Sequence, residues 1–206
     1  IRVLSPFFGN TIFTVSSVIS VVLAALSLGY YIGGKIADKY PEEKLFYKII
    51  SLGGFAVVFL HLLGVIFLSN IGYKLSIIQG PIISSVVLFF LQSFLLGTLS
   101  PFAIKLQKIR LEEIGIGSVS GEIFFWSTLG SIFGSLSAGF FLIPNFGIDK
   151  IILGTGIVLI VLGLLGNLKI KFNQKLFLII VMPLGFFITT NLLFITPENI
   201  IYIKDS

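Results

Sequence analysis

Six long apolar stretches, separated by short charged clusters, limit what this chain can fold into. A helix needs about 20 mostly apolar residues to cross the hydrocarbon core of a bilayer. The stretches that approach or exceed this length are roughly Thr11–Ala37, Leu45–Ser69, Gly80–Ile104, Ile123–Pro144, Lys150–Leu168 and Leu176–Ile195. The sequence therefore predicts an all-α fold, a polytopic membrane bundle of about six transmembrane helices.

The composition favours the same class. Hydrophobic residues make up 56% of the 206 residues and charged residues only 11%. A soluble chain of this length has too little interior to bury so much apolar surface. The chain has no cysteine, which excludes disulfides and thiolate metal sites. We expect the lipid bilayer, and no nucleic acid, to be the partner of this surface.

The basic residues predict an orientation in the membrane. Ten of the 14 Lys and Arg residues flank the first, third and fifth connections between the stretches. The four on the opposite side are Arg2, Lys74, Lys150 and Lys204. Loops rich in Lys and Arg stay on the cytoplasmic side of a membrane. We therefore expect a multi-pass protein of the cell membrane with its basic loops in the cytoplasm and both Ile1 and Ser206 outside.

Small residues mark two of the stretches as packing helices. Gly29 and Gly33 stand four residues apart in the first stretch, and Gly130, Gly134 and Gly139 lie in the fourth. Small residues let helix backbones approach closely in lipid, where the hydrophobic effect does not drive helices together. We expect both helices to lie inside the bundle, with packing inside the molecule favoured over a dimer interface.

Three polar side chains are candidates for a role within the membrane: His61, Gln92 and Glu122. Ionisable residues at membrane depth are functional candidates by default. His61 is interpreted as a lone histidine with no carboxylate at comparable depth, so a helix–helix hydrogen bond is favoured over a proton relay. Gln92 is interpreted as a packing contact in the same way. Glu122 is expected in the first turn of the fourth helix, capped by Ser118 or Ser120, which favours a capping role over a coupling role.

The sequence contains no recognisable catalytic constellation. Paired carboxylates, a metal-ligand cluster, a Ser/His/Asp set and a glycine-rich phosphate loop between strand and helix are all missing. We therefore predict no catalytic residue, no metal site and no cofactor in this chain.

The end of the first stretch resembles a transporter motif. The helix-end sequence GGKIADK, with Gly33, Gly34, Asp38 and Lys39, is similar to the Gly-x-x-Ala-Asp-Arg loop of major-facilitator transporters. That loop lies at the cytoplasmic end of their second helix. The glycine-rich fourth stretch then corresponds to their fifth helix. The resemblance implies a bundle built like a major-facilitator half.

A narrower family is more similar over nearly the whole chain. The order of Phe8-Gly9, the segment 29–38, Gly97, Pro101 and the glycine-rich segment 121–147 resembles the membrane domain fused ahead of spermidine-synthase-like domains. The final residues 202–206, YIKDS, resemble the entry strand of that enzyme domain. The resemblance implies a membrane bundle over residues 1–199 and the start of a truncated soluble domain at 200–206.

The sequence departs from both patterns near the loop and in the fourth stretch. Pro41, Glu42 and Glu43 stand where transporters continue with glycine and basic residues, and Ser127 replaces an Asn that is common in the fused family. The orientation also conflicts with the resemblance, because decarboxylated S-adenosylmethionine is cytoplasmic while the loop charges place Ser206 outside.

Two functions follow as expectations. In the first, the bundle anchors an aminopropyltransferase-like domain of polyamine biosynthesis and serves it with substrate or product. In the second, the chain is a transporter, or part of one, for a small solute such as a polyamine. A purely structural anchor without a cavity is the third reading.

Overall fold

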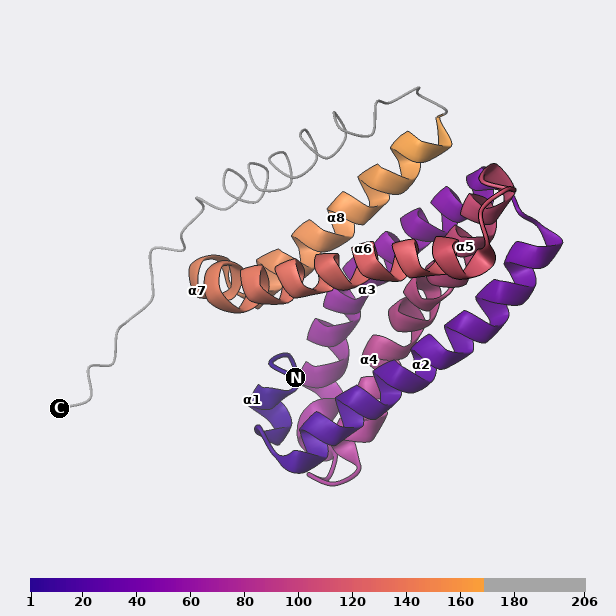
Figure 1. Ribbon diagram of the computed structural model, residues 1–206. Coiled ribbons are helices and arrows are strands. Elements are labelled where there is room, and N and C mark those ends of the chain that lie inside the picture. Colours follow the sequence, from indigo (N-terminus) through magenta and orange to yellow (C-terminus); the bar gives the residue numbers. More distant parts are fainter. Residues whose placement is uncertain (169–206) are drawn as a thin grey trace. The chain divides into compact units, whose positions relative to one another are not determined.

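The computed structural model describes residues 1–168, and this part of the chain is helical throughout, apart from its connections (Figure 1). The sixth apolar stretch, Leu176–Ile195, and the expected start of a soluble domain at 200–206 lie outside the described residues. Within residues 1–168 no strand is formed.

Five helical segments are long and apolar enough to cross a membrane. They are α2 (Ile12–Lys39), α3 (Glu43–Ile71), α4 (Gly80–Gly97) with α5 (Leu99–Arg110), α6 (Ile116–Leu136) with the π-helical η2 (Ser137–Leu142) and α7 (Ile143–Phe146), and α8 (Ile148–Asn167). The short helices α1 (Ser5–Phe8) and η1 (Gly72–Lys74) complete the described part. The all-helical, multi-pass class predicted from the sequence agrees with this structure.

The fourth long helix begins earlier than the sequence predicts, at Ile116 rather than Ile123. Gly115 is its N-cap residue, in an extended conformation, and its carbonyl accepts from the backbone N–H of Ser118 at 3.1 Å. Ser118 and Ser120 therefore lie inside the helix and do not cap it. The expected start was wrong because an apolar run marks only the part of a helix suited to hydrocarbon, while the helix itself continues through polar residues.

The third stretch is divided into α4 and α5 at Thr98. Pro101 has no N–H to donate to the carbonyl of Gly97, which interrupts the helical hydrogen-bond ladder. The carbonyl of Leu95, close to the break, accepts from both the Thr98 hydroxyl at 2.7 Å and the Thr98 backbone N–H at 3.2 Å. The two helices still form one candidate span.

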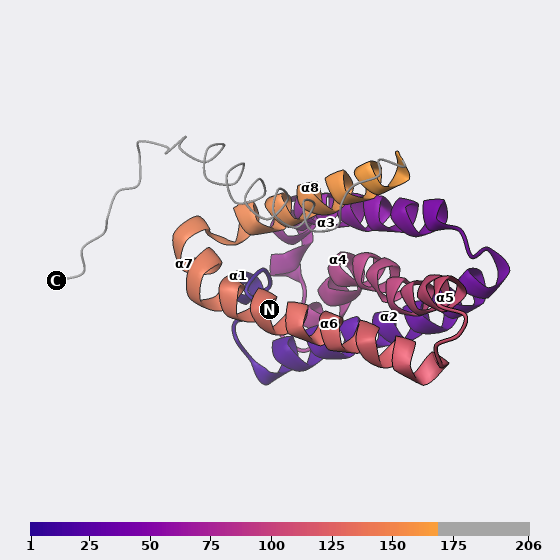
Figure 2. The same cartoon turned by 45° about the horizontal axis from the view of Figure 1, so that its top comes forward.

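Helices α2 and α4 run in the same direction and meet through small residues (Figure 2). A Cβ atom at Gly29 would lie 2.5 Å from the carbonyl oxygen of Phe94 and 3.1 Å from the Cα of Gly97. A Cβ at Gly33 would lie 2.6 Å from the Cα of Thr98. Backbones this close need glycine, so Gly29 and Gly33 lie at a helix–helix contact.

Helices α3 and α8 run in opposite directions and form a second close contact. A Cβ atom at Gly54 would lie 2.7 Å from the carbonyl oxygen of Gly156, and one at Gly163 would lie 2.6 Å from the carbonyl oxygen of Tyr47. The sequence interpretation did not single out these glycines. Gly156 and Gly163 are seven residues apart in α8 and therefore lie on one helix face. This spacing is the sequence signal that could have identified them as packing residues.

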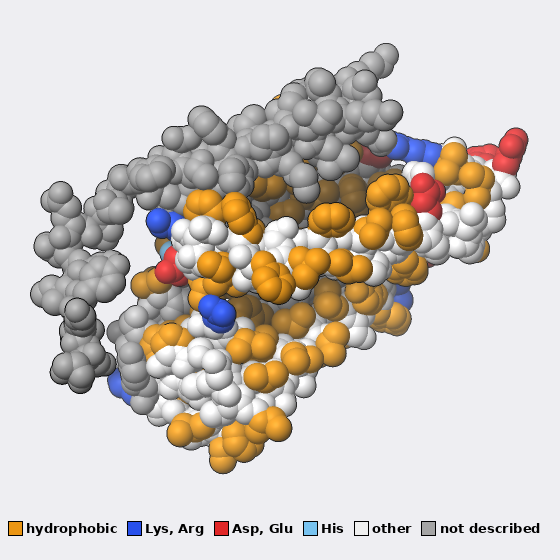
Figure 3. Space-filling view, turned by 60° about the vertical axis from the view of Figure 1, so that its left-hand side comes forward, with side chains coloured by type: hydrophobic (Ala, Val, Ile, Leu, Met, Phe, Trp, Pro, Cys, Tyr) orange, Lys and Arg blue, Asp and Glu red, His pale blue; other side chains and the backbone are white. Residues whose placement is uncertain are grey.

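Helix α6 differs from the expectation that it lies inside the bundle. Among the described residues, nothing lies within 4 Å of a Cβ built at Gly130, Gly134 or Gly139. Large side chains of this helix are mostly exposed, including Phe133 at 67% and Trp126 at 64%, and hydrophobic side chains are spread over the described surface (Figure 3). Its small-residue face therefore has no packing role within residues 1–168.

A compact core holds α1 against α3 and α4. Leu4 and Phe8 of the N-terminal segment are buried with Leu60, Leu68 and Leu88. The ring of Phe8 lies where a Cβ at Gly80 would have to be placed, so this glycine lets the N-terminal segment pack onto the start of α4. This contact fixes α1 beside the second half of α3.

Candidate functional site

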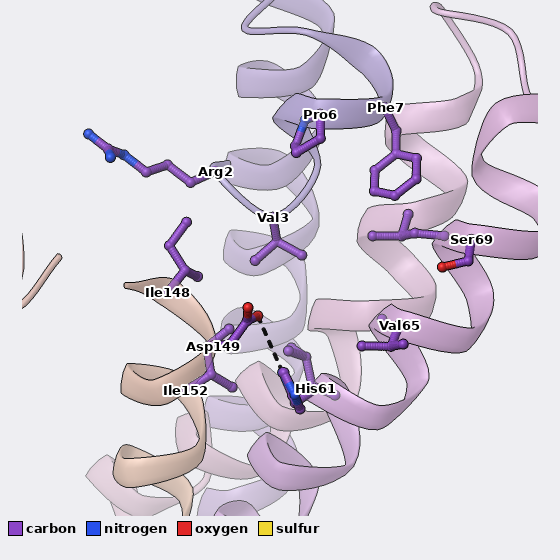
Figure 4. Close-up of a pocket in the computed structure, with 13 residues that line it drawn as sticks. Arg2, Val3, Pro6, Phe7, His61, Val65, Ser69, Ile148, Asp149 and Ile152 are labelled. Carbon is purple, nitrogen blue, oxygen red and sulfur yellow. Dashed lines mark ion pairs between the residues drawn. The ribbon is translucent and has the colours of Figure 1, made fainter. Parts of the chain in front are cut away.

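A pocket of about 360 Å³ lies between the N-terminal segment, the second half of α3 and the start of α8 (Figure 4). Much of its wall is apolar, contributed by Val3, Phe7, Val65, Leu68, Ile148 and Ile152. Its volume is at the lower end of the range typical of small-molecule sites, about 300–1,000 Å³. The pocket therefore has room for a small ligand.

Two ionisable side chains face each other in this pocket. The Nδ1 atom of His61 lies 3.5 Å from the Oδ1 atom of Asp149, with His61 largely buried at 19% exposure and Asp149 exposed at 80% (Figure 4). Asp149 is in the first turn of α8, where the positive end of the helix dipole favours a negative charge. The pair links α3 to α8 and becomes an ion pair when the imidazole is protonated.

The sequence interpretation missed Asp149, because it placed this residue in a loop before the fifth stretch. The register of α3 and α8 explains the pairing. Gly54 meets Gly156, and residue 61 is seven positions later in α3 while residue 149 is seven positions earlier in α8. In antiparallel helices these displacements, about two turns each, bring the two residues to the same level. His61 therefore has a carboxylate partner, contrary to the expectation.

The pocket also contains Arg2 and Ser69. Arg2 precedes α1, and its guanidinium extends away from the His61–Asp149 pair in Figure 4. Ser69 lies on the α3 side of the pocket near Phe7 (Figure 4). Because Arg2 points outward, Asp149 is the charged group closest to His61 among the residues drawn.

The other end of the helices carries two further ion pairs. Lys105 Nζ lies 2.8 Å from Asp38 Oδ1, and Arg110 donates to Glu43 at 2.7 Å. They join the end of α2 and the start of α3 to α5. Lys39 lies over the ring of Tyr40, with its Nζ 5.2 Å from the ring centroid.

The aspartate of the helix-end loop motif thus forms an ion pair at the end of the bundle where the connections 39–43 and 110–115 lie. Gly34, unlike Gly33, has room around it, because the nearest atom to a Cβ placed there is Pro101 Cβ at 3.9 Å. Glu43, where transporters are expected to be basic, forms an ion pair of its own.

The other polar candidates lie away from the pocket. The Oε1 atom of Gln92 is buried and accepts no hydrogen bond from any described residue, and the same holds for the hydroxyl oxygens of Ser84 and Ser85. Glu122 is exposed in the second turn of α6. Within residues 1–168 no three His, Asp or Glu side chains gather as metal ligands. Of the three predicted polar candidates, only His61 lies in the pocket. It faces Asp149, which the sequence interpretation had not named.

Comparison of the chain with known protein families, with curated proteins and with solved structures finds no match.

Proposed function

We propose that this chain is the membrane domain of a spermidine synthase-like protein. In this proposal the bundle, built like a major-facilitator half with about six helices, anchors a C-terminal aminopropyltransferase-like domain. It also serves that domain with substrate or product. The basic loops face the cytoplasm of a cell in whose plasma membrane the bundle lies.

The observation that carries the proposal is the geometry of the helix-end loop motif. Asp38, the aspartate of the GGKIADK sequence, forms an ion pair with Lys105 across the α2–α5 contact. Gly33, from the same sequence, lies against Thr98. A motif that resembles the transporter loop therefore links two helices at the end of the bundle, which supports a related architecture.

The coding sequence beyond Ser206 tests this proposal. A glycine-rich nucleotide-binding strand–turn–helix followed by acidic residues is expected there. Membranes that contain the natural full-length protein should then convert labelled putrescine and decarboxylated S-adenosylmethionine to labelled spermidine. A second set of apolar spans in place of the nucleotide-binding segment would refute the proposal.

The alternative is transport of a small solute, and the pocket at His61 and Asp149 favours it. A ligand-sized pocket between α1, α3 and α8 is a feature that a simple anchor does not need. In this alternative, vesicles reconstituted with the full-length protein accumulate labelled solute, with labelled spermidine as the first probe. Uptake equal to that of empty vesicles, with the protein inserted in either orientation, would exclude spermidine transport.

A further inference from the structure

The pocket between α1, α3 and α8 combines one exposed carboxylate with an apolar wall. The side chain of Asp149 is 80% exposed, so its charge is available to a ligand. Ile152 lies next to it on α8, and Val65 lies on the α3 side of the pocket, beyond His61 (Figure 4). Next to an apolar wall a charge interacts more strongly than in bulk water, because the local dielectric is lower.

We propose that this pocket binds an ammonium group carried on a small apolar body. The ammonium would contact the carboxylate of Asp149, and the apolar body would lie along Val65, Ile152 and Phe7. This inference needs only the described pocket and is independent of the anchoring function proposed above; it gives the transport alternative, which uses the same pocket, a ligand chemistry. The ligand is defined by its chemistry, a primary amine with a short hydrocarbon group.

The charges around the pocket favour a cation over an anion. The carboxylate of Asp149 faces the pocket from α8, whereas the guanidinium of Arg2, at the edge of the pocket, extends away from the His61–Asp149 pair (Figure 4). An anionic ligand close to the apolar wall would be repelled by Asp149. An amine avoids this repulsion and forms a charge-assisted hydrogen bond, which is stronger than a neutral one.

His61 lies on the other side of the same carboxylate. Its Nδ1 atom lies 3.5 Å from the Oδ1 atom of Asp149, so the imidazole and the ammonium group of a ligand both approach this carboxylate. The ammonium group would therefore bind on the exposed side of Asp149, away from the imidazole.

The ammonium group has two possible sources. It can belong to a free amine in the water or to the headgroup of a phospholipid such as phosphatidylethanolamine, whose acyl chains would provide the apolar body. The shared chemistry is an ammonium on an apolar body. The lipid composition of the membrane distinguishes the two sources.

The experiment uses the full chain in nanodiscs of phosphatidylglycerol, a lipid without an ammonium group, and labelled n-hexylamine as the probe. Saturable binding to one site is expected at pH 8. Asp149→Asn should weaken it by up to about fivefold, because an ion pair at an exposed carboxylate contributes up to about 1 kcal/mol. The matched control Glu122→Gln removes a carboxylate from α6, away from the pocket, and should leave the affinity unchanged.

Two more variants test the remaining parts of the proposal. His61→Gln should still bind the probe at pH 8, because the ammonium group contacts Asp149 and not the imidazole. Val65→Lys places a cation in the pocket and should weaken binding at pH 8 as strongly as Asp149→Asn does. Val65 lies six residues before the end of α3 at Ile71, where a lysine can extend its ammonium group towards the membrane surface, so this change is not expected to prevent folding.

Competition by phosphatidylethanolamine added to the nanodiscs would identify the lipid headgroup as the source, and the absence of competition would identify a free amine. The proposal is overturned if Asp149→Asn binds n-hexylamine as tightly as the unchanged protein. It is also overturned if Glu122→Gln weakens binding equally, since the attraction would then be that of the general surface charge. Loss of binding in His61→Gln would also overturn it, since the imidazole and not the carboxylate would then hold the probe.

Discussion

Gly29→Ala tests whether the contact between α2 and α4 holds the bundle together. The added Cβ would lie 2.5 Å from the carbonyl oxygen of Phe94 and 3.1 Å from the Cα of Gly97. Both contacts are to backbone atoms, so no side-chain rotation can relieve them. The two helices would have to move apart along the contact.

The magnitude follows from these distances. Non-bonded heavy atoms prefer a separation of about 3.5 Å, which requires a shift of about 1 Å at the Phe94 carbonyl. Overpacking of this kind costs about 1–3 kcal/mol. The cost of Gly29→Ala should be near the upper value, because the added Cβ meets backbone atoms that cannot rotate away. Alanine is a better helix former than glycine by up to about 1 kcal/mol, which offsets part of the cost. We expect a net loss of about 2 kcal/mol in the free energy of unfolding.

The matched control is Gly130→Ala in α6, where nothing among the described residues lies within 4 Å of the added Cβ. Only the gain in helix propensity remains there, so this variant should be as stable as the unchanged protein or slightly more stable. Both variants can be unfolded from mixed micelles with increasing SDS and followed by far-ultraviolet circular dichroism. Equal stability of the two variants would refute the reasoning, as would a loss confined to Gly130→Ala.

The lengths of the apolar runs predict the first, second and fifth helices well. The observed bounds of α2, α3 and α8 differ from the predicted ones by no more than two residues at either end. This success has a physical basis, since hydrocarbon requires an apolar run and a hydrogen-bonded backbone at the same place. Helix α6 was predicted less well because its first two turns are rich in glycine and polar residues. These turns lie before the apolar run, so the length of the run does not show that they are helical.

The candidate site depends on the register between helices, which the sequence does not state. His61 was recognised as unusual because it interrupts an apolar stretch, whereas Asp149 sits at a helix start, where acidic residues are common. Their pairing is set by the contact of Gly54 with Gly156, a tertiary feature. The sequence therefore identified one member of the pair and could not supply the other.

Three further predictions concern single positions. Asp38→Asn should lower the free energy of unfolding by no more than about 1 kcal/mol, because both side chains of the ion pair are exposed, Asp38 at 72% and Lys105 at 38%. A larger loss in the SDS titration would contradict this and show that the pair is better shielded from solvent. Ser84→Ala should leave the protein as stable or stabilise it by up to about 1 kcal/mol, since the buried hydroxyl oxygen has no hydrogen-bond partner among the described residues. A loss of stability in that variant would contradict this reading. The orientation predicted from the loop charges can be tested by thiol labelling, because the chain has no cysteine and each introduced thiol is unique. With a membrane-impermeant maleimide, Lys74→Cys should react in intact cells, whereas Glu112→Cys should react only after permeabilisation. Glu112 follows the basic residues Lys105, Lys108 and Arg110, and the positive-inside rule places this loop in the cytoplasm. The reverse pattern would place the basic loops outside and refute the predicted topology.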